Sequence, residues 1–353
     1  MASRTGLGYS TVAVAGGRVV TMGYDKGSSL DSIWCLDALT GEVKWKHSYH
    51  SEIWNRAHEG GTVNTPSIDG DVVYTLNREG NLYCLELATG AVVWHNALMA
   101  EGNTNELTIP TWGFSASPLV VGERLFLNCG RILSIDKKSG AVKWRSKDYG
   151  DGYGTPIAFE RDGTAVLAAL NGTGAVLVSQ ADGSGLGFAT FTGKNRGIQA
   201  ATPVLIGDSI FVSSGMIPSC ARFALGEATL KPIWQNREMI SSFSGCVKVG
   251  EHLYGFDGQI LKCIDLDGAA AWSERGIGNG AVLAAGERLL VMGGTGELIV
   301  AKATAEKFDE LSRVKLFDEG RFWTKPILVN GIIYCRNSKG TLVARDHREV
   351  ETK

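Results

Sequence analysis

The side chains that could bind a ligand gather in seven polar stretches, each lying between two strand-like runs. The stretches are residues 49–59, 101–112, 148–153, 194–199, 237–239, 275–279 and 319–323. They contain Trp54, Trp112 and Trp323 together with the arginines Arg56, Arg196, Arg275 and Arg321. Arginine and tryptophan are enriched where a protein grips a partner, and both stack against apolar or charged groups. The pattern therefore favours a binding surface for a peptide or a sugar.

The same stretches supply further polar candidates for this surface, namely His58, Glu59, Asp151, Tyr153, Lys194 and Gln199. Histidine and glutamate are metal-ligand types, but no spacing among these residues fixes a coordination geometry, so we predict no metal site. Each arginine has a plainer interpretation, because an arginine at a loop end is usually solvated or paired with a nearby carboxylate. Trp112 could equally pack at the rim of the fold.

Motifs for covalent catalysis are missing from the sequence. There is no nucleophile-elbow pattern, and no order of Ser, His and Asp indicates a triad. The seven cysteines include no adjacent pair, no CxxC and no CxxCH haem motif. Most of them lie inside apolar runs, so we expect small buried hydrophobic side chains.

The elements that must position the polar stretches repeat along the chain. A Gly-x-Val-x-Trp pattern occurs at residues 41–45, 90–94 and 140–144, with a degenerate copy at 268–272. An acidic turn with Thr or Ser precedes each of the three clear copies. An Asp or Glu that opens a turn can accept hydrogen bonds from the following amides, and Gly supplies the positive φ before the next strand. Each copy is therefore predicted to join two strands.

A second mark lies upstream in each unit, where a small residue and Pro begin a strand that turns back into an aromatic run. Clear copies start at Thr65, Ser117, Thr202 and Lys325, and weaker ones at Ser10, Thr155, Gly245 and Ala281. These make eight units of about 44 residues in a chain of 353, enough for four short strands each. The sequence predicts an all-β protein, an eight-bladed β-propeller of four-stranded antiparallel blades.

We expect one propeller domain over residues 1–353. Its predicted blades span residues 8–49, 61–98, 113–148, 152–191, 198–236, 240–275, 277–317 and 322–348. The last unit has only three strands, so the N-terminal segment is predicted to close the ring as a short outer strand. Five units keep a tryptophan that should fill the gap between neighbouring blades: Trp45, Trp94, Trp144, Trp234 and Trp272. The polar stretches then become loops around the central funnel.

Composition narrows the choice of partner. The formal charge of −2 gives no reason to expect a nucleic acid. No window has the roughly 18 apolar residues that a transmembrane helix needs. The remaining candidates are a protein partner or a glycan at one face of the propeller, and we expect a monomer.

The repeated Leu-Asp-Ala-x-Thr-Gly-x-Val-x-Trp pattern at 36–45, 85–94 and 135–144 resembles the PQQ-like, quinoprotein-type β-propellers. Segments such as residues 112–119 and 253–258 are most similar to the non-catalytic BamB-like branch, including such proteins of planctomycete-type bacteria. The resemblance covers essentially the whole chain and implies a non-enzymatic scaffold that holds a protein partner through its funnel loops. The matching residues are turn and packing residues, which speak for fold more than for function.

The resemblance also carries an enzymatic alternative, a PQQ- and calcium-dependent alcohol or sugar dehydrogenase. Such enzymes stack PQQ between a tryptophan and a disulfide of adjacent cysteines, and this sequence has no adjacent cysteines. We therefore expect no cofactor. Family members are usually exported, which implies a periplasmic or cell-surface protein. Because Met1 to Arg4 run directly into the first hairpin without a signal peptide, the resemblance further implies that a leader is missing.

Overall fold

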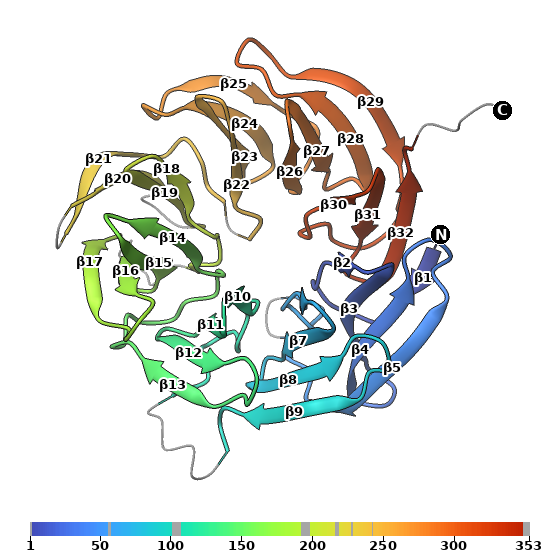
Figure 1. Cartoon of the computed structure of the whole chain (residues 1–353). Helices are drawn as coiled ribbons and strands as arrows, with labels where there is room; N and C mark the ends of the chain where they lie inside the picture. Colours follow the sequence, from blue (N-terminus) through green and yellow to red (C-terminus); the bar gives the residue numbers. More distant parts are fainter. Residues whose placement is uncertain are drawn as a thin grey trace.

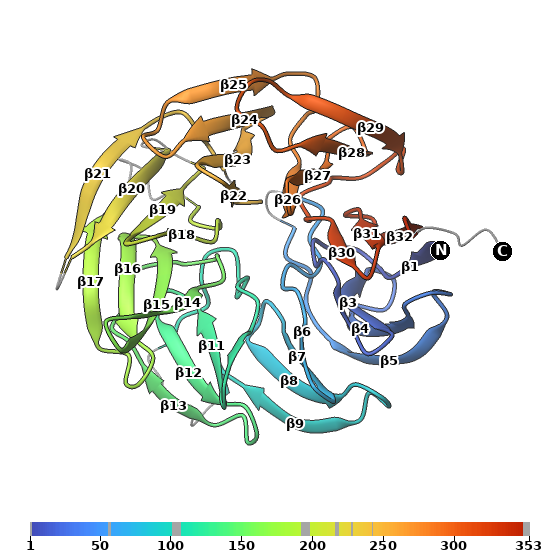
Figure 2. The same ribbon diagram turned by 45° about the horizontal axis from the view of Figure 1, so that its top comes forward.

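The protein folds into eight four-stranded antiparallel sheets that surround a common centre, as Figure 1 shows. This computed structural model describes residues 2–55, 58–100, 107–191, 198–215, 219–226, 229–241 and 243–348. In Figures 1 and 2 the first strands of the blades, such as β10, β22 and β26, lie nearest the centre. The predicted eight-bladed β-propeller is thus confirmed. In the described part of the chain, no helix is long and apolar enough to cross a membrane.

The strands of each blade follow one another in the sequence, apart from the outer strand of blade 8. Blade 1 contains β2 (Ala13–Ala15), β3 (Arg18–Asp25), β4 (Leu30–Asp37) and β5 (Val43–His50), and blade 2 contains β6 (Ser67–Asp69), β7 (Val72–Leu76), β8 (Asn81–Glu86) and β9 (Val92–Ala97). Blade 3 contains β10 (Leu119–Val121), β11 (Arg124–Asn128), β12 (Ile132–Asp136) and β13 (Val142–Arg145), and blade 4 contains β14 (Ile157–Arg161), β15 (Thr164–Asn171), β16 (Gly174–Ser179) and β17 (Gly185–Thr190). Blade 5 contains β18 (Val204–Ile206), β19 (Ser209–Ser213), β20 (Cys220–Leu225) and β21 (Leu230–Asn236), and blade 6 contains β22 (Cys246–Val249), β23 (His252–Asp257), β24 (Ile260–Asp265) and β25 (Ala270–Glu274). Blade 7 contains β26 (Ala281–Ala285), β27 (Arg288–Met292), β28 (Glu297–Lys302) and β29 (Asp309–Lys315), and blade 8 contains β30 (Ile327–Val329), β31 (Ile332–Arg336), β32 (Thr341–Asp346) and β1 (Ala2–Arg4).

The acidic turns have the predicted chemistry. Asp37 Oδ1 accepts hydrogen bonds from the backbone N–H groups of Leu39 and Thr40, both at 3.0 Å. Gly41 follows with a φ of 76°, a conformation that glycine adopts without the steric cost of a Cβ atom. The register then shifts between Cys35 and Leu36, which produces a bulge beside the tryptophan of the outer strand.

The five repeated tryptophans join neighbouring blades, as predicted. Each indole Nε1–H donates a hydrogen bond to a backbone carbonyl of the next blade. The pairs are Trp45 with Leu87 at 2.8 Å, Trp94 with Lys137 at 3.1 Å, Trp144 with Gln180 at 3.2 Å, Trp234 with Leu266 at 2.7 Å and Trp272 with Thr304 at 2.8 Å. A buried indole needs such an acceptor, so these residues pack blades together instead of facing a ligand.

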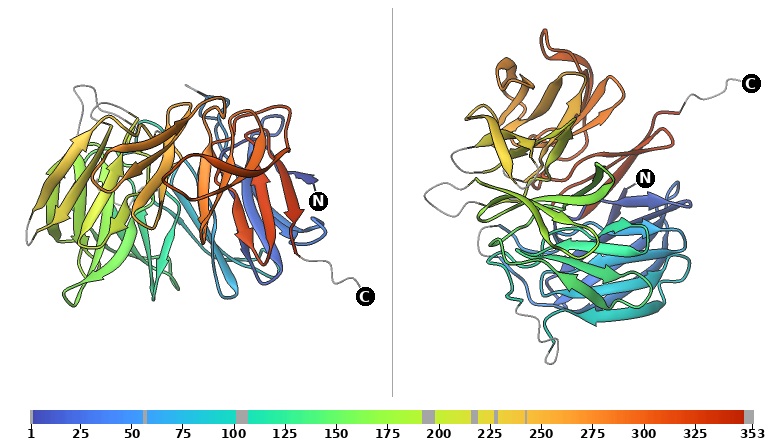
Figure 3. Two further views of the ribbon diagram at one scale, coloured as in Figure 1. Left: turned by 90° about the horizontal axis from the view of Figure 1, so that it is seen from above. Right: turned by 60° about the vertical axis from the view of Figure 1, so that its left-hand side comes forward.

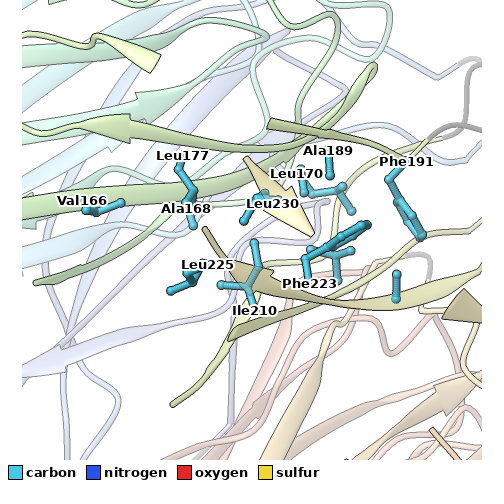
Figure 4. Packing of buried hydrophobic residues seen from close by; sticks show 13 residues of the cluster. Val166, Ala168, Leu170, Leu177, Ala189, Phe191, Ile210, Phe223, Leu225 and Leu230 are labelled. Carbon is cyan, nitrogen blue, oxygen red and sulfur yellow. The ribbon is translucent and has the colours of Figure 1, made fainter. Parts of the chain in front are cut away.

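The apolar core is divided among the interfaces between blades. Eight separate clusters of buried side chains occur, each formed by two adjacent blades of the described chain. Figure 4 shows the cluster between blades 4 and 5, where Leu177, Ile210 and Phe223 interdigitate. All seven cysteines are buried with free thiols, which confirms that they act as small core residues.

The ring is closed by the N-terminal segment, as predicted. Ala2, Ser3 and Arg4 pair with Val343, Leu342 and Thr341 of β32, which completes blade 8 as a four-stranded sheet. Figures 1 and 3 show β1 lying beside the last blade. The segment that follows β1 runs toward the centre, and this path brings Tyr9 next to loops of the last blade.

Candidate functional site

Loops from seven blades meet around one cavity at the centre of the propeller, which we call the axial pocket. Its volume is about 220 Å³. Six of its lining side chains are aromatic rings: Tyr9, His58, Trp112, Tyr153, Phe243 and Trp323. The other lining residues are Val63, Arg78, Ser115, Ile198 and Ala200. The pocket is therefore apolar, with one guanidinium group in its wall.

Most lining residues occupy equivalent positions in the repeat. Tyr9, Val63, Ser115, Tyr153, Ala200, Phe243 and Trp323 stand two residues before Thr11, Thr65, Ser117, Thr155, Thr202, Gly245 and Lys325, which occupy equivalent positions shortly before the inner strands. Each of these seven blades therefore presents the side chain of one equivalent position to the axial pocket.

A stack of aromatic rings forms one wall of the axial pocket. Trp323 stacks with Tyr9, with ring centroids 4.9 Å apart, and with Phe243 at 4.4 Å. His58 meets Tyr9 edge-on at 4.9 Å. The Arg321 guanidinium lies 5.1 Å from the Trp323 ring centroid, close enough for a cation–π interaction. This wall joins blades 1, 6 and 8, which are distant in the sequence.

Glu59 and Arg321 lie behind this wall and hold it together. The Tyr9 hydroxyl donates a hydrogen bond to Glu59 Oε2 at 2.6 Å, and Arg321 Nε lies 3.6 Å from the same oxygen. Burial alone would raise the pKa of Glu59, but the Tyr9 hydrogen bond and the charge of Arg321 outweigh it and hold the pKa below its ordinary value. Burial, followed by the bond to Glu59, raises the pKa of Tyr9. Tyr9 is therefore a neutral donor at pH 7.

On the opposite side, Tyr153 is held by two predicted residues that do not line the axial pocket. Its hydroxyl donates to Asp151 Oδ2 at 2.9 Å, and the Thr111 hydroxyl donates to the same oxygen at 2.8 Å. The carbonyl of the buried Gln199 accepts a hydrogen bond from the Tyr153 backbone N–H at 3.0 Å. Asp151 and Gln199 thus position the tyrosine.

Arg78 and His58 form the polar corner of the axial pocket. Arg78 lies in the turn between β7 and β8, and its Nη2 is 3.2 Å from Nε2 of His58. The His58 Nδ1 accepts a hydrogen bond from the Gly60 backbone N–H at 3.1 Å. Burial, followed by the charges of Arg78 and Arg321, lowers the pKa of His58 to about 4. His58 is therefore neutral at pH 7, and its ring has a single acceptor nitrogen for these two donors.

The thirteen sequence-predicted site residues are distributed unevenly around this pocket. His58, Trp112, Tyr153 and Trp323 line it, whereas Glu59, Asp151, Gln199 and Arg321 support or flank the lining. Trp54 and Arg275 are outside the lining, although the Trp54 carbonyl accepts a hydrogen bond from Arg78 at 3.4 Å. Arg56, Lys194 and Arg196 lie outside the residues that the structure describes.

Sequence reasoning missed three important lining residues, Tyr9, Arg78 and Phe243. Tyr9 and Phe243 could have been found by aligning the eight units and reading the residue two places before Thr11, Gly245 and their equivalents. Arg78 departs from the repeat, because the matching turn of blade 8, residues 337–340, has Ser338 in its place. An arginine at a position where another blade has a small residue was the available signal.

The fold and the site together define a quinoprotein-like β-propeller with a small aromatic pocket on its axis. The chain belongs to the family described as "Outer membrane protein assembly factor BamB", whose model matches residues 31–274. A search of curated proteins gave no match to the chain.

Solved structures share the fold at low sequence identity. The structure of BamB from Moraxella catarrhalis has a TM-score of 0.70 and 16% identity, covering 98% of this chain and 98% of that chain. The computationally designed Ika8 protein has a TM-score of 0.67 and 13% identity, covering 97% of this chain and 98% of that one. A quinohemoprotein alcohol dehydrogenase from Pseudomonas putida HK5 has a TM-score of 0.71 and 13% identity, covering 96% of this chain and 72% of that chain. The fold is thus shared by a BamB protein and by an enzyme.

The described lining residues do not fit a quinone held by calcium. Ca²⁺ takes about six to eight oxygen ligands, usually several carboxylates among them. No Asp or Glu is among the residues that line the axial pocket, and within the described ranges no three His, Cys, Asp or Glu side chains gather as a metal site. Glu59 and Asp151 already accept hydrogen bonds from Tyr9, Thr111 and Tyr153. The pocket offers π-faces and hydrogen-bond donors instead of metal ligands.

Proposed function

We propose that this chain is a non-enzymatic binding propeller that holds a protein partner by taking one residue of the partner into the axial pocket. The observation that carries the proposal is the convergence of aromatic side chains from separate blades on one cavity beside a buried arginine. Aromatic and arginine side chains that line a water-poor pocket are typical of binding hot spots.

The size of the axial pocket supports a single-residue occupant. Its volume of about 220 Å³ is below the roughly 300–1,000 Å³ of common small-molecule sites. A cavity of this size suits one large side chain, with the surrounding loops left to contact the rest of the partner. The aromatic stack that forms one wall of the pocket is already in place. Binding would therefore cost little conformational entropy of the protein.

The proposal includes a location and a state of assembly. The family description refers to outer membrane assembly, and we place this chain in the periplasm or at the cell surface on that ground. We propose that it acts as a monomer, because closing the propeller ring leaves no blade missing a strand. No cofactor takes part in this function.

Selection of peptides from a phage-displayed library tests the proposal. We expect the wild-type protein to enrich related peptides that the double variant Trp112→Ala/Trp323→Ala no longer binds. Trp34→Ala is a matched control, because Trp34 lies on β4 and is outside the axial pocket. Near-UV circular dichroism would verify that each variant remains folded. Failure to enrich any peptide whose binding needs Trp112 or Trp323 would contradict the proposed function.

The enzymatic and glycan alternatives have their own readouts. The purified protein is titrated with PQQ and Ca²⁺ while absorbance, melting temperature and dye-linked alcohol oxidation are followed. We expect no saturable change, and dye-linked oxidation would overturn the proposal in favour of a dehydrogenase. Glycan binding that is lost on changing Trp54, Trp112 and Trp323 to Ala would favour a carbohydrate-binding propeller.

A further inference from the structure

The polar corner of the axial pocket has an excess of hydrogen-bond donors. Both ring nitrogens of His58 face donors: the Gly60 backbone N–H lies 3.1 Å from Nδ1, and Nη2 of Arg78 lies 3.2 Å from Nε2. A neutral imidazole has only one acceptor nitrogen, and an arginine can only donate. His58 can therefore accept from only one of these two donors. An oxygen that enters the axial pocket beside Arg78 would supply the missing acceptor.

Arg78 is a buried charge without an ion pair. Only 6% of its surface is exposed, and its Nε has no hydrogen-bond partner. Apart from the contact with His58, the only acceptor of the guanidinium among the described residues is the Trp54 carbonyl, at 3.4 Å. The buried carboxylate of Asp31 acts on Arg78 from beyond ion-pair distance. A buried cation is costly unless an anion compensates it, and the described residues do not provide that anion at close range.

A second basic side chain, that of Lys325, lies near the axial pocket. One layer along the axis, blades 1 to 4 form a chain of hydrogen bonds in which Thr11, Thr65 and Ser117 donate their backbone N–H groups to the hydroxyls of Thr65, Ser117 and Thr155. In blade 8, the corresponding residue is Lys325.

The Lys325 side chain reaches toward blade 6. Its Nζ lies 3.8 Å from the point that a Cβ atom on Gly245 would occupy. Lys325 stands two residues after Trp323, and Gly245 two residues after Phe243, so the amino group lies close to the segments that carry these lining rings. No described side chain forms an ion pair with it. Burial lowers the pKa of Lys325. An anion in the axial pocket would favour the protonated form of this lysine.

We propose that the axial pocket recognises a carboxylate attached to an apolar group, with Arg78 donating to the carboxylate beside His58 and the aromatic wall contacting the apolar group. This inference rests on the proposed function and specifies the group that is recognised: the C-terminal carboxylate of a partner whose last residue is aromatic or aliphatic. The carboxylate oxygen supplies the acceptor that this corner lacks. Lys325 lies nearby without bonding the ligand.

Calorimetric titration with a matched pair of probes tests this inference. N-acetyl-L-phenylalanine carries the carboxylate, and N-acetyl-L-phenylalaninamide has the same apolar group without the charge. We expect the acid to bind about 10–100-fold more tightly than the amide, the range that hydrogen bonds to a charged group supply. 3-Phenylpropionate, which lacks the peptide group, separates a chain end from a free organic acid. If 3-phenylpropionate binds more weakly than N-acetyl-L-phenylalanine, the result supports a peptide ligand. Equal binding of the two would contradict a peptide C-terminus as the ligand.

Variants of Arg78, His58 and Lys325 locate the effect. Arg78→Met should abolish most of the preference for the acid over the amide, and His58→Ala should reduce it. Lys325→Thr, which restores the hydroxyl found in other blades, should weaken acid binding by less than about tenfold, because the lysine acts through its field alone. Arg275→Met is the control, since Arg275 is exposed and outside the axial pocket. It should change nothing.

The possible results separate the two proposals. Equal binding of acid and amide would overturn the carboxylate inference, while peptides selected through Trp112 and Trp323 would still support the binding function. If the acid is preferred but Arg78→Met retains the preference, the assignment of Arg78 is wrong. If neither probe binds, the carboxylate inference fails, and the peptide selection decides the proposed function separately.

Discussion

Arg336 Nη1 donates a hydrogen bond to the carbonyl of Gly8 at 2.6 Å and so ties the last blade to the start of the chain. Arg336 is almost fully buried, and its guanidinium has four further acceptors at 2.8–3.2 Å: the Thr5 hydroxyl and the carbonyls of Gly6, Ser10 and Met22. Burial lowers the pKa of Arg336 to about 9. Five hydrogen bonds therefore compensate this charge without a carboxylate, at the point where the ring closes.

Arg336→Met should lower the free energy of unfolding by about 3–5 kcal/mol, because removing the donor group leaves buried carbonyls without partners. Urea denaturation followed by circular dichroism measures the change. Arg336→Lys keeps the charge but not the planar fork of donors, and should give an intermediate loss. A loss below about 1 kcal/mol for the Met variant would show that the hydrogen bonds of Arg336 do not stabilise the closed ring.

Removal of residues 1–7 should also destabilise the closed ring. Besides β1, the deletion removes the hydrogen bonds of Thr5 N–H to Gly340 and of Leu7 to Tyr24, each worth about 1 kcal/mol. It also exposes the edge of β32, and an open strand edge invites pairing between chains. We expect a lower melting temperature in calorimetry and self-association in size-exclusion chromatography. An unchanged melting temperature would contradict the role of β1 in closure.

The glycine of the repeated turn should tolerate no side chain. A Cβ atom on Gly140, whose φ is 72°, would lie 2.6 Å from the Trp94 ring of the preceding blade. Gly17 has the same φ of 72°, but nothing lies within 4 Å of the corresponding point. Gly140→Ala should therefore lose about 1–3 kcal/mol more stability than Gly17→Ala, because only the former overpacks an interface. Thermal unfolding of the two variants measures the difference, and equal losses would mean that backbone strain alone matters.

His58 should make stability depend on pH in the acidic range. Burial is the main cause that lowers its pKa from 6.5 to about 4, so the unfolded chain takes up the proton at a higher pH than the folded one. The contribution of His58 is therefore complete above pH 6.5 and is lost as the pH falls toward about 4. His58→Gln removes this term. The difference in melting temperature between the two proteins should be flat above pH 6.5, and a flat difference at all pH values would contradict the assignment.

Much of the fold could be predicted from local residue patterns. The turn at Asp37 and Gly41 and the position of Trp45 belong to short segments whose hydrogen bonds form within one hairpin or with the adjacent blade. Such contacts recur wherever the residues recur, so a repeat in the sequence becomes a repeat in space. Even the closing strand followed from counting strands, because the last unit lacked one.

The candidate site could be predicted only in part. Trp112 and Trp323 were predicted because tryptophan is common at binding surfaces, and both line the axial pocket. Trp54 was predicted on the same ground but lies outside the lining. No local pattern separates these cases, because the distinction is the distance of each loop from the axis. No local motif marks Tyr9 or Phe243. They line the axial pocket because equivalent positions of different blades meet there.

The sequence by itself determined the blade, the number of blades and the residues that join them, because those depend on turn chemistry and on neighbouring strands. The tertiary structure alone decided which side chains share the axis, because closing the ring brings Tyr9 of the first blade against Trp323 of the last. It also decided the charge of the site. A lone arginine in a sequence tells nothing of its partners, and only packing shows that Arg78 is buried and that no carboxylate of the described ranges forms an ion pair with it.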